Sequence, residues 1–174
     1  GLNVAADPLF TIGYTGVNAG MVIGVADDAG MHSSQNEQDS RFYGKFALLP
    51  IFEPSSQQEA YEMTCAAFDF SEAVKLPVLM RITTRMAHSR AVVNLTDTPR
   101  KQNAINRPDD VRRWILLPAF AKKRYVELLA QQDDLLKSSV ESSFNSYSKG
   151  SAPERGVITT GIAYNYYMEN CGNC

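Results

Sequence analysis

Hydrophobic and polar positions alternate along the chain in blocks that predict strands and helices in turn. Apolar runs rich in β-branched residues at 21–26, 48–52 and 77–83 predict buried strands. Between them, residues 40–47 predict a short helix, and residues 57–74 predict a longer one, because its apolar residues fall near a 3.6-residue spacing. This order of strand, helix, strand, helix, strand predicts an α/β fold with a parallel sheet and flanking helices.

Capping residues mark the expected starts of two helices. Asp7 as N-cap and Pro8 at the first helical position predict a helix before the first strand. In the helix predicted at 57–74, Ser55 or Ser56 is the expected cap. Gly13, Gly16 and Gly20 near the first helix are explained best by close packing.

Beyond residue 90 the pattern is less regular. Residues 91–95 predict a short strand, and residues 96–110 have the polar, Pro-containing composition of a linker. Residues 119–143 have helical periodicity and predict one long helix. Residues 156–161 (GVITTG) predict a strand that enters a helix at 162–170.

These segments predict three parts. Residues 1–95 form a first α/β unit, residues 96–154 are a linker with the long helix, and residues 155–174 are the start of a second α/β domain. The length of 174 residues, with 44% hydrophobic and 21% charged residues, agrees with one packed domain and a fraction more.

Charge and hydropathy argue against two classes of partner. The net charge is −2 and no basic stripe with interleaved aromatic residues occurs, which argues against nucleic acid. No apolar run approaches the roughly 20 residues that cross a bilayer, which argues against a membrane. Three cysteines are a poor disulfide framework, so a reducing, cytoplasmic location is expected. Cys171 and Cys174 form a C-x-x-C, but without a second pair or a nearby His they do not predict a metal site.

Polar loops follow the first and third predicted strands. Residues 27–41 (DDAGMHSSQNEQDSR) hold four carboxylates, one His and one Arg, and residues 83–90 (TTRMAHSR) hold two Arg and one His. In a parallel sheet both loops lie at the carboxyl edge, where ligands bind in open α/β folds. We expect the two loops to share a site, and the alternative for residues 27–41 is a solvated surface loop.

Six phrases that extend over almost the whole chain carry a family resemblance. They are GLNVAADPLFTIGYTGVNAG, VADDAGMHSSQNEQDSRFY, EPSSQQEAYEM, LPVLMRITTRMAHSR, LLPAFAKKRYVEL and GVITTGIAYNY. In these phrases the chain resembles the alpha subunits of indolepyruvate:ferredoxin oxidoreductases, within the thiamine-diphosphate-dependent 2-oxoacid:ferredoxin oxidoreductases. The resemblance implies an internal fragment of a longer subunit, in which residues 1–95 are the later half of a pyrimidine-binding domain.

The resemblance also implies a reaction. An ylide of thiamine diphosphate adds to the ketone of an aryl 2-oxoacid such as indolepyruvate, and carbon dioxide leaves. Electrons then pass through iron-sulfur clusters to ferredoxin, and coenzyme A takes the acyl group. The implied partners are therefore a beta subunit, ferredoxin, coenzyme A and the aryl 2-oxoacid.

Parts of that machinery are expected outside these 174 residues. The resemblance implies that the Glu that starts ylide formation lies before Gly1, and that the groups holding the diphosphate, magnesium and clusters lie after Cys174. The isolated chain is therefore expected to be inactive. A homodimer that covers the exposed edges of its partial sheet is one expected assembly.

Within this family, roles follow for the first loop. Arg41 is the candidate contact for the substrate carboxylate, because a guanidinium binds a carboxylate through two N–H groups; the alternative is an ion pair with Glu37 or Asp39. His32 is a candidate acid or base, and its alternative is a hydrogen-bonding loop residue. Asn36 completes the candidate substrate-binding set. The candidate cofactor-binding residues are Gly30, which also permits a turn, and Ser33, Ser34 and Gln35.

The remaining charged loop residues have several open roles. Arg85, His88 and Arg90 are expected to pair with acidic residues of the first loop, and the alternatives are an anion site or contact with a partner domain. Asp27 and Asp28 are expected to cap the first loop or to hold Arg41.

Two other functions stay open beside the enzyme fragment. One is a cofactor-free α/β interaction or scaffold module derived from the family. The other is part of a pyruvate-type 2-oxoacid:ferredoxin oxidoreductase.

Overall fold

The central sheet has three parallel strands, and its middle strand is the last one in the sequence. The computed structural model describes residues 1–97, 102–150, 152 and 154–171. Its strands, in the spatial order β1-β3-β2, are β1 (Val22–Asp27), β2 (Ile51–Phe52) and β3 (Val78–Thr83). β1 pairs with β3 along its whole length, and β2 pairs with β3 on the other side. The predicted α/β fold with a parallel sheet is confirmed.

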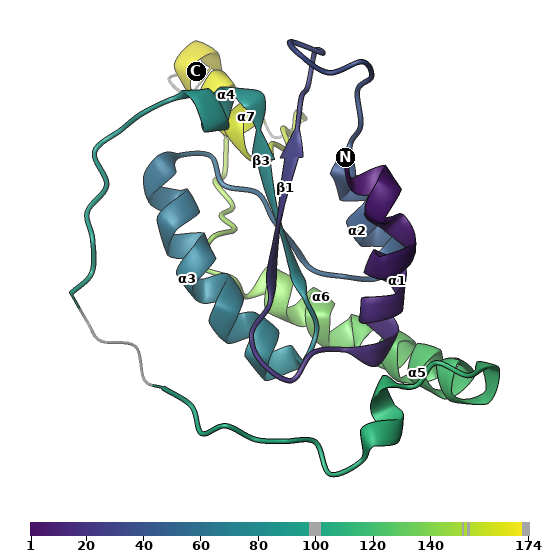
Figure 1. Cartoon of the computed structure of the whole chain (residues 1–174). Coiled ribbons are helices and arrows are strands. Elements are labelled where there is room, and N and C mark those ends of the chain that lie inside the picture. Colours follow the sequence, from purple (N-terminus) through teal and green to yellow (C-terminus); the bar gives the residue numbers. More distant parts are fainter. Residues whose placement is uncertain (98–101, 151, 153, 172–174) are drawn as a thin grey trace.

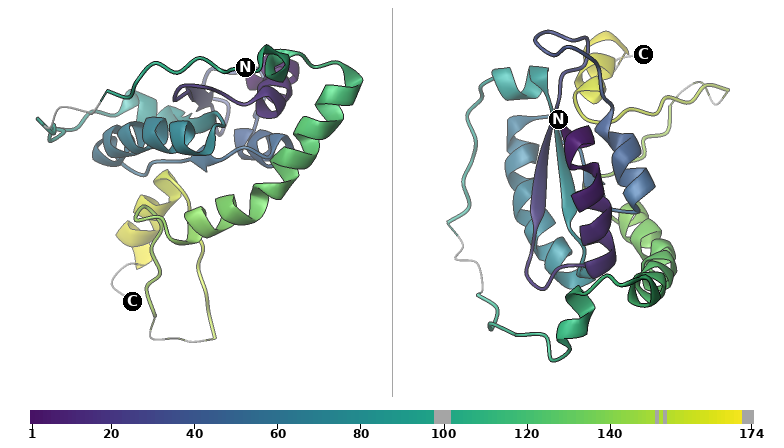
Figure 2. Two further views of the ribbon diagram at one scale, coloured as in Figure 1. Left: turned by 90° about the horizontal axis from the view of Figure 1, so that it is seen from below. Right: turned by 45° about the vertical axis from the view of Figure 1, so that its right-hand side comes forward.

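Helices cover both faces of the sheet (Figure 1 and Figure 2). α1 (Ala6–Thr15) and α2 (Ser40–Ala47) pack on one face, and α3 (Gln57–Val74) packs on the other. The first face has a buried core of Leu9, Val25, Ala47, Leu49, Leu76, Leu79 and Leu128. The second face has a buried core of Met63, Ala67, Val78 and Met80.

α3 begins and ends where the sequence predicts. The hydroxyl of Ser56 accepts a hydrogen bond from the backbone N–H of Glu59 at 3.2 Å. The carboxylate of Glu59 in turn accepts a hydrogen bond from the hydroxyl of Ser55 at 2.7 Å. Both hydrogen bonds stabilise the first turn of the helix. The helix ends at Val74, and its C-cap Lys75 has a left-handed φ of 60°.

Two boundaries near the first loop differ from prediction. A short 3-10 helix (Leu2–Ala5) precedes α1, so Asp7 lies inside the helix and is not its N-cap. Leu48 is the left-handed C-cap of α2, with φ 60°, so the second strand is shorter than the predicted range 48–52.

Three predicted elements of the later chain are wrong. Residues 91–95 and 156–161 are irregular, and neither run pairs with a strand. A run of β-prone residues forms a strand only where a neighbouring strand shares its backbone hydrogen bonds. The long helix is divided at Gln131 into α5 (Pro118–Ala130) and α6 (Gln132–Val140). A 3-10 helix (Val111–Trp114) precedes α5, and the predicted linker at 96–110 is irregular where it is described.

The C-terminal helix is present as predicted, as α7 (Ile162–Cys171). The division of the chain at residues 95 and 154 stays a prediction. Cys171 is exposed, and its C-x-x-C partner Cys174 lies outside the described residues. In the described ranges, no helix combines the length and the apolar character that a bilayer crossing requires.

Close backbone packing explains two glycines between α1 and β1. Gly16 has φ 68°, and a Cβ there would lie 2.7 Å from the carbonyl oxygen of Lys75. A Cβ at Gly20 would lie 2.5 Å from the carbonyl oxygen of Phe68 in α3. Because neither backbone atom can rotate away, both positions are restricted to glycine.

We expect Gly20→Ala to destabilise the protein by about 1–3 kcal/mol, since the added methyl group overpacks a backbone contact. Gly24→Ala is the matched control, because a Cβ at Gly24 meets nothing within 4 Å. The control should be neutral or slightly stabilising, by up to about 0.5 kcal/mol. Urea unfolding followed by circular dichroism measures both, and equal effects of the two substitutions would contradict the packing explanation.

Candidate functional site

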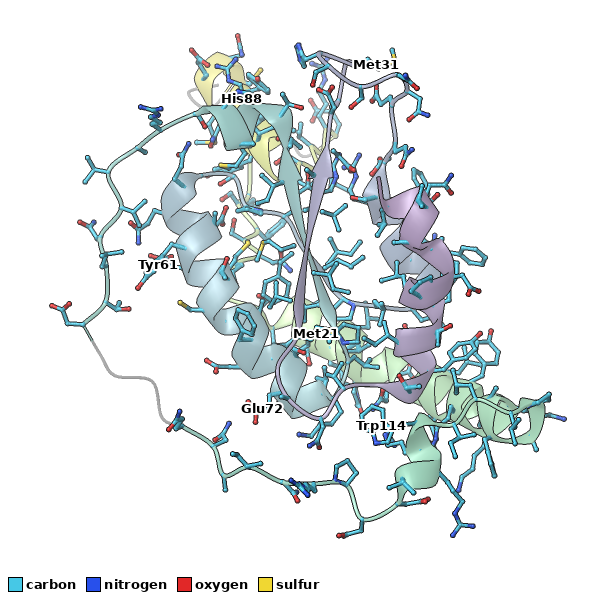
Figure 3. The ribbon with its side chains drawn as sticks, in the orientation of Figure 1. Met21, Met31, Tyr61, Glu72, His88 and Trp114 are labelled. Carbon is cyan, nitrogen blue, oxygen red and sulfur yellow. The ribbon has the colours of Figure 1, made fainter. Side chains whose placement is uncertain are left out.

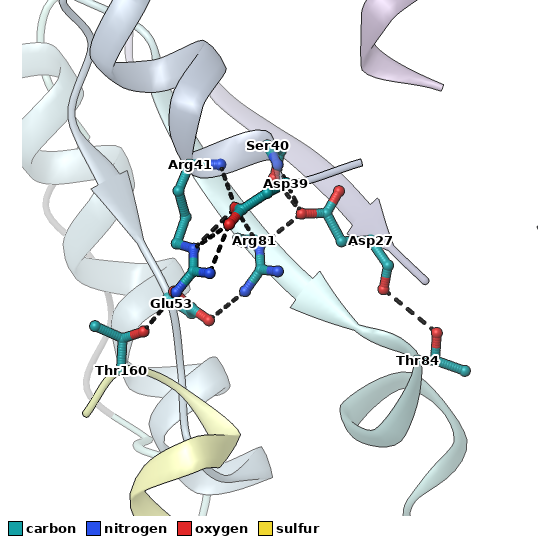
Figure 4. Close-up of polar contacts among 8 residues, drawn as sticks. All are labelled: Asp27, Asp39, Ser40, Arg41, Glu53, Arg81, Thr84 and Thr160. Carbon is teal, nitrogen blue, oxygen red and sulfur yellow. Dashed lines mark hydrogen bonds and ion pairs between the residues drawn. The ribbon is translucent and has the colours of Figure 1, made fainter. Parts of the chain in front are cut away.

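The two polar loops meet at the carboxyl edge of the sheet, as expected. The first loop extends from the end of β1 to the start of α2, and the second segment is a short helix, α4 (Thr84–His88), rather than a loop. The hydroxyl of Thr84 lies 2.6 Å from the Asp28 carboxylate and 3.3 Å from the carbonyl oxygen of Asp27. The ends of β1 and β3 are therefore joined directly by side-chain contact (Figure 4).

A buried arginine lies behind this edge. Side chains alternate along β3, so Arg81 faces the same side of the sheet as the buried Leu79, toward α2. Its Nε donates to the Asp27 carboxylate at 2.6 Å, and its Nη1 donates to the Glu53 carboxylate. The side chains of Arg81, Asp27 and Glu53 are only 7%, 4% and 11% exposed (Figure 4). The three form one buried ion cluster that spans β1, β3 and the end of β2.

The same Asp27 oxygen also fixes the start of α2. It accepts hydrogen bonds from the backbone N–H and the hydroxyl of Ser40, at 2.9 Å and 2.7 Å. Asp27 was expected to cap the first loop or to hold Arg41, but it holds Arg81 and Ser40. One carboxylate therefore sets the position of α2 relative to the sheet.

Arg41 forms an ion pair with Asp39, which is the alternative to a substrate contact. Its Nε donates to Asp39 Oδ1 at 2.8 Å and its Nη2 to Oδ2 at 2.6 Å, while Nη1 donates to the hydroxyl of Thr160 at 3.1 Å. The hydrogen bond between the two side chains is the main cause that raises the pKa of Arg41 and lowers the pKa of Asp39. The backbone passes close to Glu53 at Gly161, where φ is 52° and a Cβ would lie 2.7 Å from Oε1. The segment before α7 therefore lies against Glu53 of the ion cluster at Gly161 and is hydrogen-bonded to Arg41 at Thr160.

Asp28 holds the tip of the first loop. Its carboxylate accepts hydrogen bonds from the backbone N–H groups of Ser33 and Ser34, at 2.7 Å and 2.8 Å. The hydrogen bond from Thr84, followed by the one from Ser33, holds the pKa of Asp28 well below its usual range. Gly30, with φ 83°, makes the expected turn. The loop is exposed but has a defined internal framework, so Asp28 caps the loop as expected.

A hollow of about 590 Å³ opens between the first loop, α4 and α7. The guanidinium carbon of Arg85 lies 5.6 Å from the centre of the Tyr166 ring at this place. Figure 3 shows His88 and Met31 at this end of the molecule. The residues that line the hollow are Ala29, His32, Thr83, Thr84, Arg85, His88, Ser89, Ile162 and Tyr166.

Only one of the predicted site residues lines this hollow in the described part of the chain, namely His32. The others, which are Gly30, Ser33, Ser34, Gln35, Asn36 and Arg41, are exposed on the loop or at the start of α2. Asn36 accepts a hydrogen bond from Gln38 at 3.0 Å. The predicted roles of these residues in binding substrate or cofactor stay predictions.

The expected pairing of the second basic set with the first loop is not found among the described residues. The two loops are joined through Thr84 instead, and Arg85 lies over the ring of Tyr166. The two alternatives for Arg85, His88 and Arg90, which are an anion site and contact with a partner domain, stay predictions.

Sequence reasoning also missed Arg81 and Tyr166. The signal for Arg81 was a single charge inside the apolar strand VLMRIT, since a buried charge needs a partner. Tyr166 had no comparable signal, because it reaches the site only through the position of α7.

Removal of the buried guanidinium should be costly. We expect Arg81→Met to lower the free energy of unfolding by about 3–5 kcal/mol, because two buried carboxylates lose their partner. Arg112→Met is the control, since Arg112 is 72% exposed in its pair with Asp110, and it should change stability by less than about 1 kcal/mol. Chemical denaturation measures both, and a loss for Arg81→Met no larger than that of the control would disprove the ion cluster.

The acid titration of Asp28 offers a second test. A carboxyl whose pKa is lowered in the folded state stabilises that state above its unfolded pKa of about 3.9, and the stabilisation is lost as pH falls further. Amide hydrogen exchange of Ser33 and Ser34 should therefore stay protected from pH 7 down to about pH 4 and weaken only below it. Asp28→Asn should reduce this protection at pH 7, whereas Asp134→Asn on the exposed face of α6 should not. Loss of protection near pH 5 in the unmodified protein would refute the assignment.

Comparison with known proteins identifies relatives over nearly the whole chain. The chain is 43% identical over 170 residues to indolepyruvate oxidoreductase subunit IorA of Methanothermobacter thermautotrophicus, an alignment that covers 97% of the chain and 28% of the relative. It is 41% identical over 174 residues to subunit IorA of Archaeoglobus fulgidus, covering 99% and 28%. It is 39% identical over 174 residues to subunit IorA of Pyrococcus abyssi, covering 97% and 27%.

The chain thus spans little more than a quarter of the length of these relatives, 28% for the first two. No protein-family model and no solved structure matches it. The alignments extend through both polar loops, the ion cluster and the segment before α7, since they cover 97% of the chain or more. By sequence, the chain is similar to an internal stretch of indolepyruvate oxidoreductase IorA subunits, as the resemblance implied.

Proposed function

We propose that this chain forms one wall of the substrate site of an indolepyruvate oxidoreductase, and that Arg85 binds the carboxylate of an aryl 2-oxoacid there. The observation that carries the proposal is the hollow in which Arg85, His32 and His88 face the apolar surface of Ile162 and Tyr166. The names of the relatives support indolepyruvate as the substrate.

The chemistry of the hollow suits such a ligand. An aryl 2-oxoacid has a carboxylate, a ketone and an aromatic ring. The guanidinium of Arg85 suits the carboxylate, and the hydroxyls of Thr83 and Ser89 suit polar oxygens. Ile162 and Tyr166 offer apolar area for the ring. In this proposal the chain binds and orients the substrate and excludes water from one side of it.

The family's cofactors do not fit the described residues alone. None of the described residues that line the hollow is a carboxylate, so the pyrimidine of thiamine diphosphate finds no acidic partner. No group of three or more His, Cys, Asp or Glu in the described ranges is placed to hold magnesium or an iron-sulfur cluster. In this proposal other parts of a whole subunit and its beta subunit hold these groups. The chain alone is then inactive, and ferredoxin and coenzyme A meet the whole cytoplasmic enzyme.

Substitution of Arg85 in a whole IorA subunit with its partner tests the proposal. We expect Arg85→Gln to raise the KM for indolepyruvate by about 10- to 100-fold, because a charge-assisted hydrogen bond is lost. Arg112→Gln is the control, because Arg112 is exposed and outside the hollow, and it should leave KM unchanged. Steady-state kinetics with indolepyruvate and with pyruvate give both values.

Arg41→Ala, measured in the same assay, decides between the two arginines. An increase in KM confined to Arg41→Ala would place the carboxylate on Arg41, as first predicted, and would overturn the role of Arg85. A preference for pyruvate would indicate the pyruvate-type enzyme. A whole protein that neither binds nor turns over any 2-oxoacid would indicate the scaffold module.

A further inference from the structure

One buried glycine attaches the segment before α7 to the carboxyl edge of the sheet. Gly161 is the only buried residue of the described range 154–171. Its φ of 52° is a conformation that favours glycine, and a Cβ there would lie 2.6 Å from Cγ of Glu53. The carboxylate of Glu53 is in turn bound by the guanidinium of Arg81. The backbone at Gly161 therefore rests on a side chain that the buried ion cluster holds in place.

Two hydrogen bonds fix the direction in which α7 leaves this contact. On one side of Gly161, the hydroxyl of Thr160 accepts a hydrogen bond from Nη1 of Arg41 at 3.1 Å (Figure 4). On the other side, the amide of Asn165 donates to the carbonyl oxygen of Ser55 at 2.6 Å. Attachment on both sides of the buried contact restricts rotation of the helix. The orientation of α7 is thus set by α2 and by the residues that follow β2.

This orientation brings two side chains of α7 to the hollow. Ile162 and Tyr166 are four positions apart, so they lie on the same face of the helix, and both line the hollow. The guanidinium carbon of Arg85 lies 5.6 Å from the centre of the Tyr166 ring. A change in the direction of α7 would therefore move the ring relative to Arg85.

We propose that the contact of Gly161 with Glu53 makes the site selective for aryl over small 2-oxoacids, because it holds the ring of Tyr166 beside Arg85. This role rests on the proposed function, in which Arg85 binds the substrate carboxylate. In indolepyruvate only the ketone carbon and one methylene group separate the carboxylate from the ring, so the ring needs an aromatic surface close to the guanidinium. Tyr166 then determines specificity, while Gly161 and Glu53, which do not line the hollow, are positioning residues.

Aryl and small 2-oxoacids depend on Tyr166 to different extents. Pyruvate has the carboxylate and the ketone but no ring, so it uses Arg85 and gains little from Tyr166. An aromatic ring that packs against Tyr166 loses contact with water and gains a favourable ring contact. Displacement of Tyr166 therefore lowers the affinity for indolepyruvate selectively. A general loss of folding would instead lower the amount of active enzyme and leave both affinities unchanged.

Steady-state kinetics of a whole IorA subunit with its partner test this role of Gly161. The two readouts are the KM for indolepyruvate and the constant for competitive inhibition by pyruvate. We expect Gly161→Ala to raise the KM about tenfold and the inhibition constant by less than about twofold, because the added methyl group pushes α7 away from Glu53. Gly156→Ala is the matched control, since a Cβ at Gly156 meets nothing within 4 Å, and it should change neither value.

Two further variants show whether Gly161 acts through the ring. Tyr166→Ala should raise the KM for indolepyruvate about tenfold, whereas Tyr166→Phe, which keeps the ring, should retain the preference for indolepyruvate over pyruvate. In the Tyr166→Ala background, Gly161→Ala should raise the KM by less than about twofold more, because the ring that it displaces is already absent. Two effects that multiply in full would mean that Gly161 acts independently of Tyr166 and would overturn the proposal.

Asn165→Ala tests the same attachment with a milder change, since it removes only an exposed hydrogen bond of α7. It should raise the KM for indolepyruvate relative to the inhibition constant of pyruvate even if Gly161→Ala lowers the yield of folded enzyme. An unchanged ratio of the two constants in Asn165→Ala and in every folded variant of Gly161 would overturn the proposal.

Arg85→Gln separates a failure of this positioning role from a failure of the proposed function. If Arg85→Gln raises both constants while Gly161→Ala raises neither, or raises both equally, the positioning role is wrong and the proposed function stands. If Arg85→Gln raises neither constant, the proposed function is wrong, and the positioning role is wrong with it.

Discussion

The need to pair one buried guanidinium determines the arrangement of the whole carboxyl edge. Arg81 is in the central strand, so its partners must come from the strands on either side, and Asp27 and Glu53 are those partners. Asp27 also binds the first residue of α2, and Glu53 lies against the backbone of Gly161 before α7. A buried charge without its partners costs several kcal/mol, so these elements hold their relative positions as one unit. The positions of the first loop and of the segment before α7, which border the hollow, are fixed by these contacts.

Local signals in the sequence were sufficient for the three strands and the main helices of the first half of the fold, but not for all of their boundaries. α3 was predicted to the residue because Ser56 and Glu59 mark its start within four positions of each other. The predictions of strands at 91–95 and 156–161 were wrong because a strand exists only beside a partner strand. A short apolar run does not show whether such a partner is present. The division of the long helix at Gln131 had no glycine or proline to announce it, and α4 is too short to show a helical period.

The candidate site shows the same division between local and distant information. Topology alone placed both loops at one edge, and the contact from Thr84 to Asp28 confirms it. The choice of Asp39 as the partner of Arg41 was one of two alternatives, since both an ion pair and a substrate contact use the same two N–H groups. Arg81 and Tyr166 escaped notice because one looked like part of a core strand and the other comes from a helix distant in the sequence.

The order β1-β3-β2 has a consequence for folding. β1 and β2 do not touch each other, because β3 lies between them, so the sheet can form only after the last strand joins. Asp27 and Arg81 are separated by 54 positions, and such distant parallel pairing is slow because a long loop must close first. During synthesis, β1 and β2 therefore emerge as two unpaired apolar segments, and the ions of the future cluster stay hydrated. β3 completes the sheet and buries the charges in the same event, so the appearance of residues 78–83 commits the domain to fold.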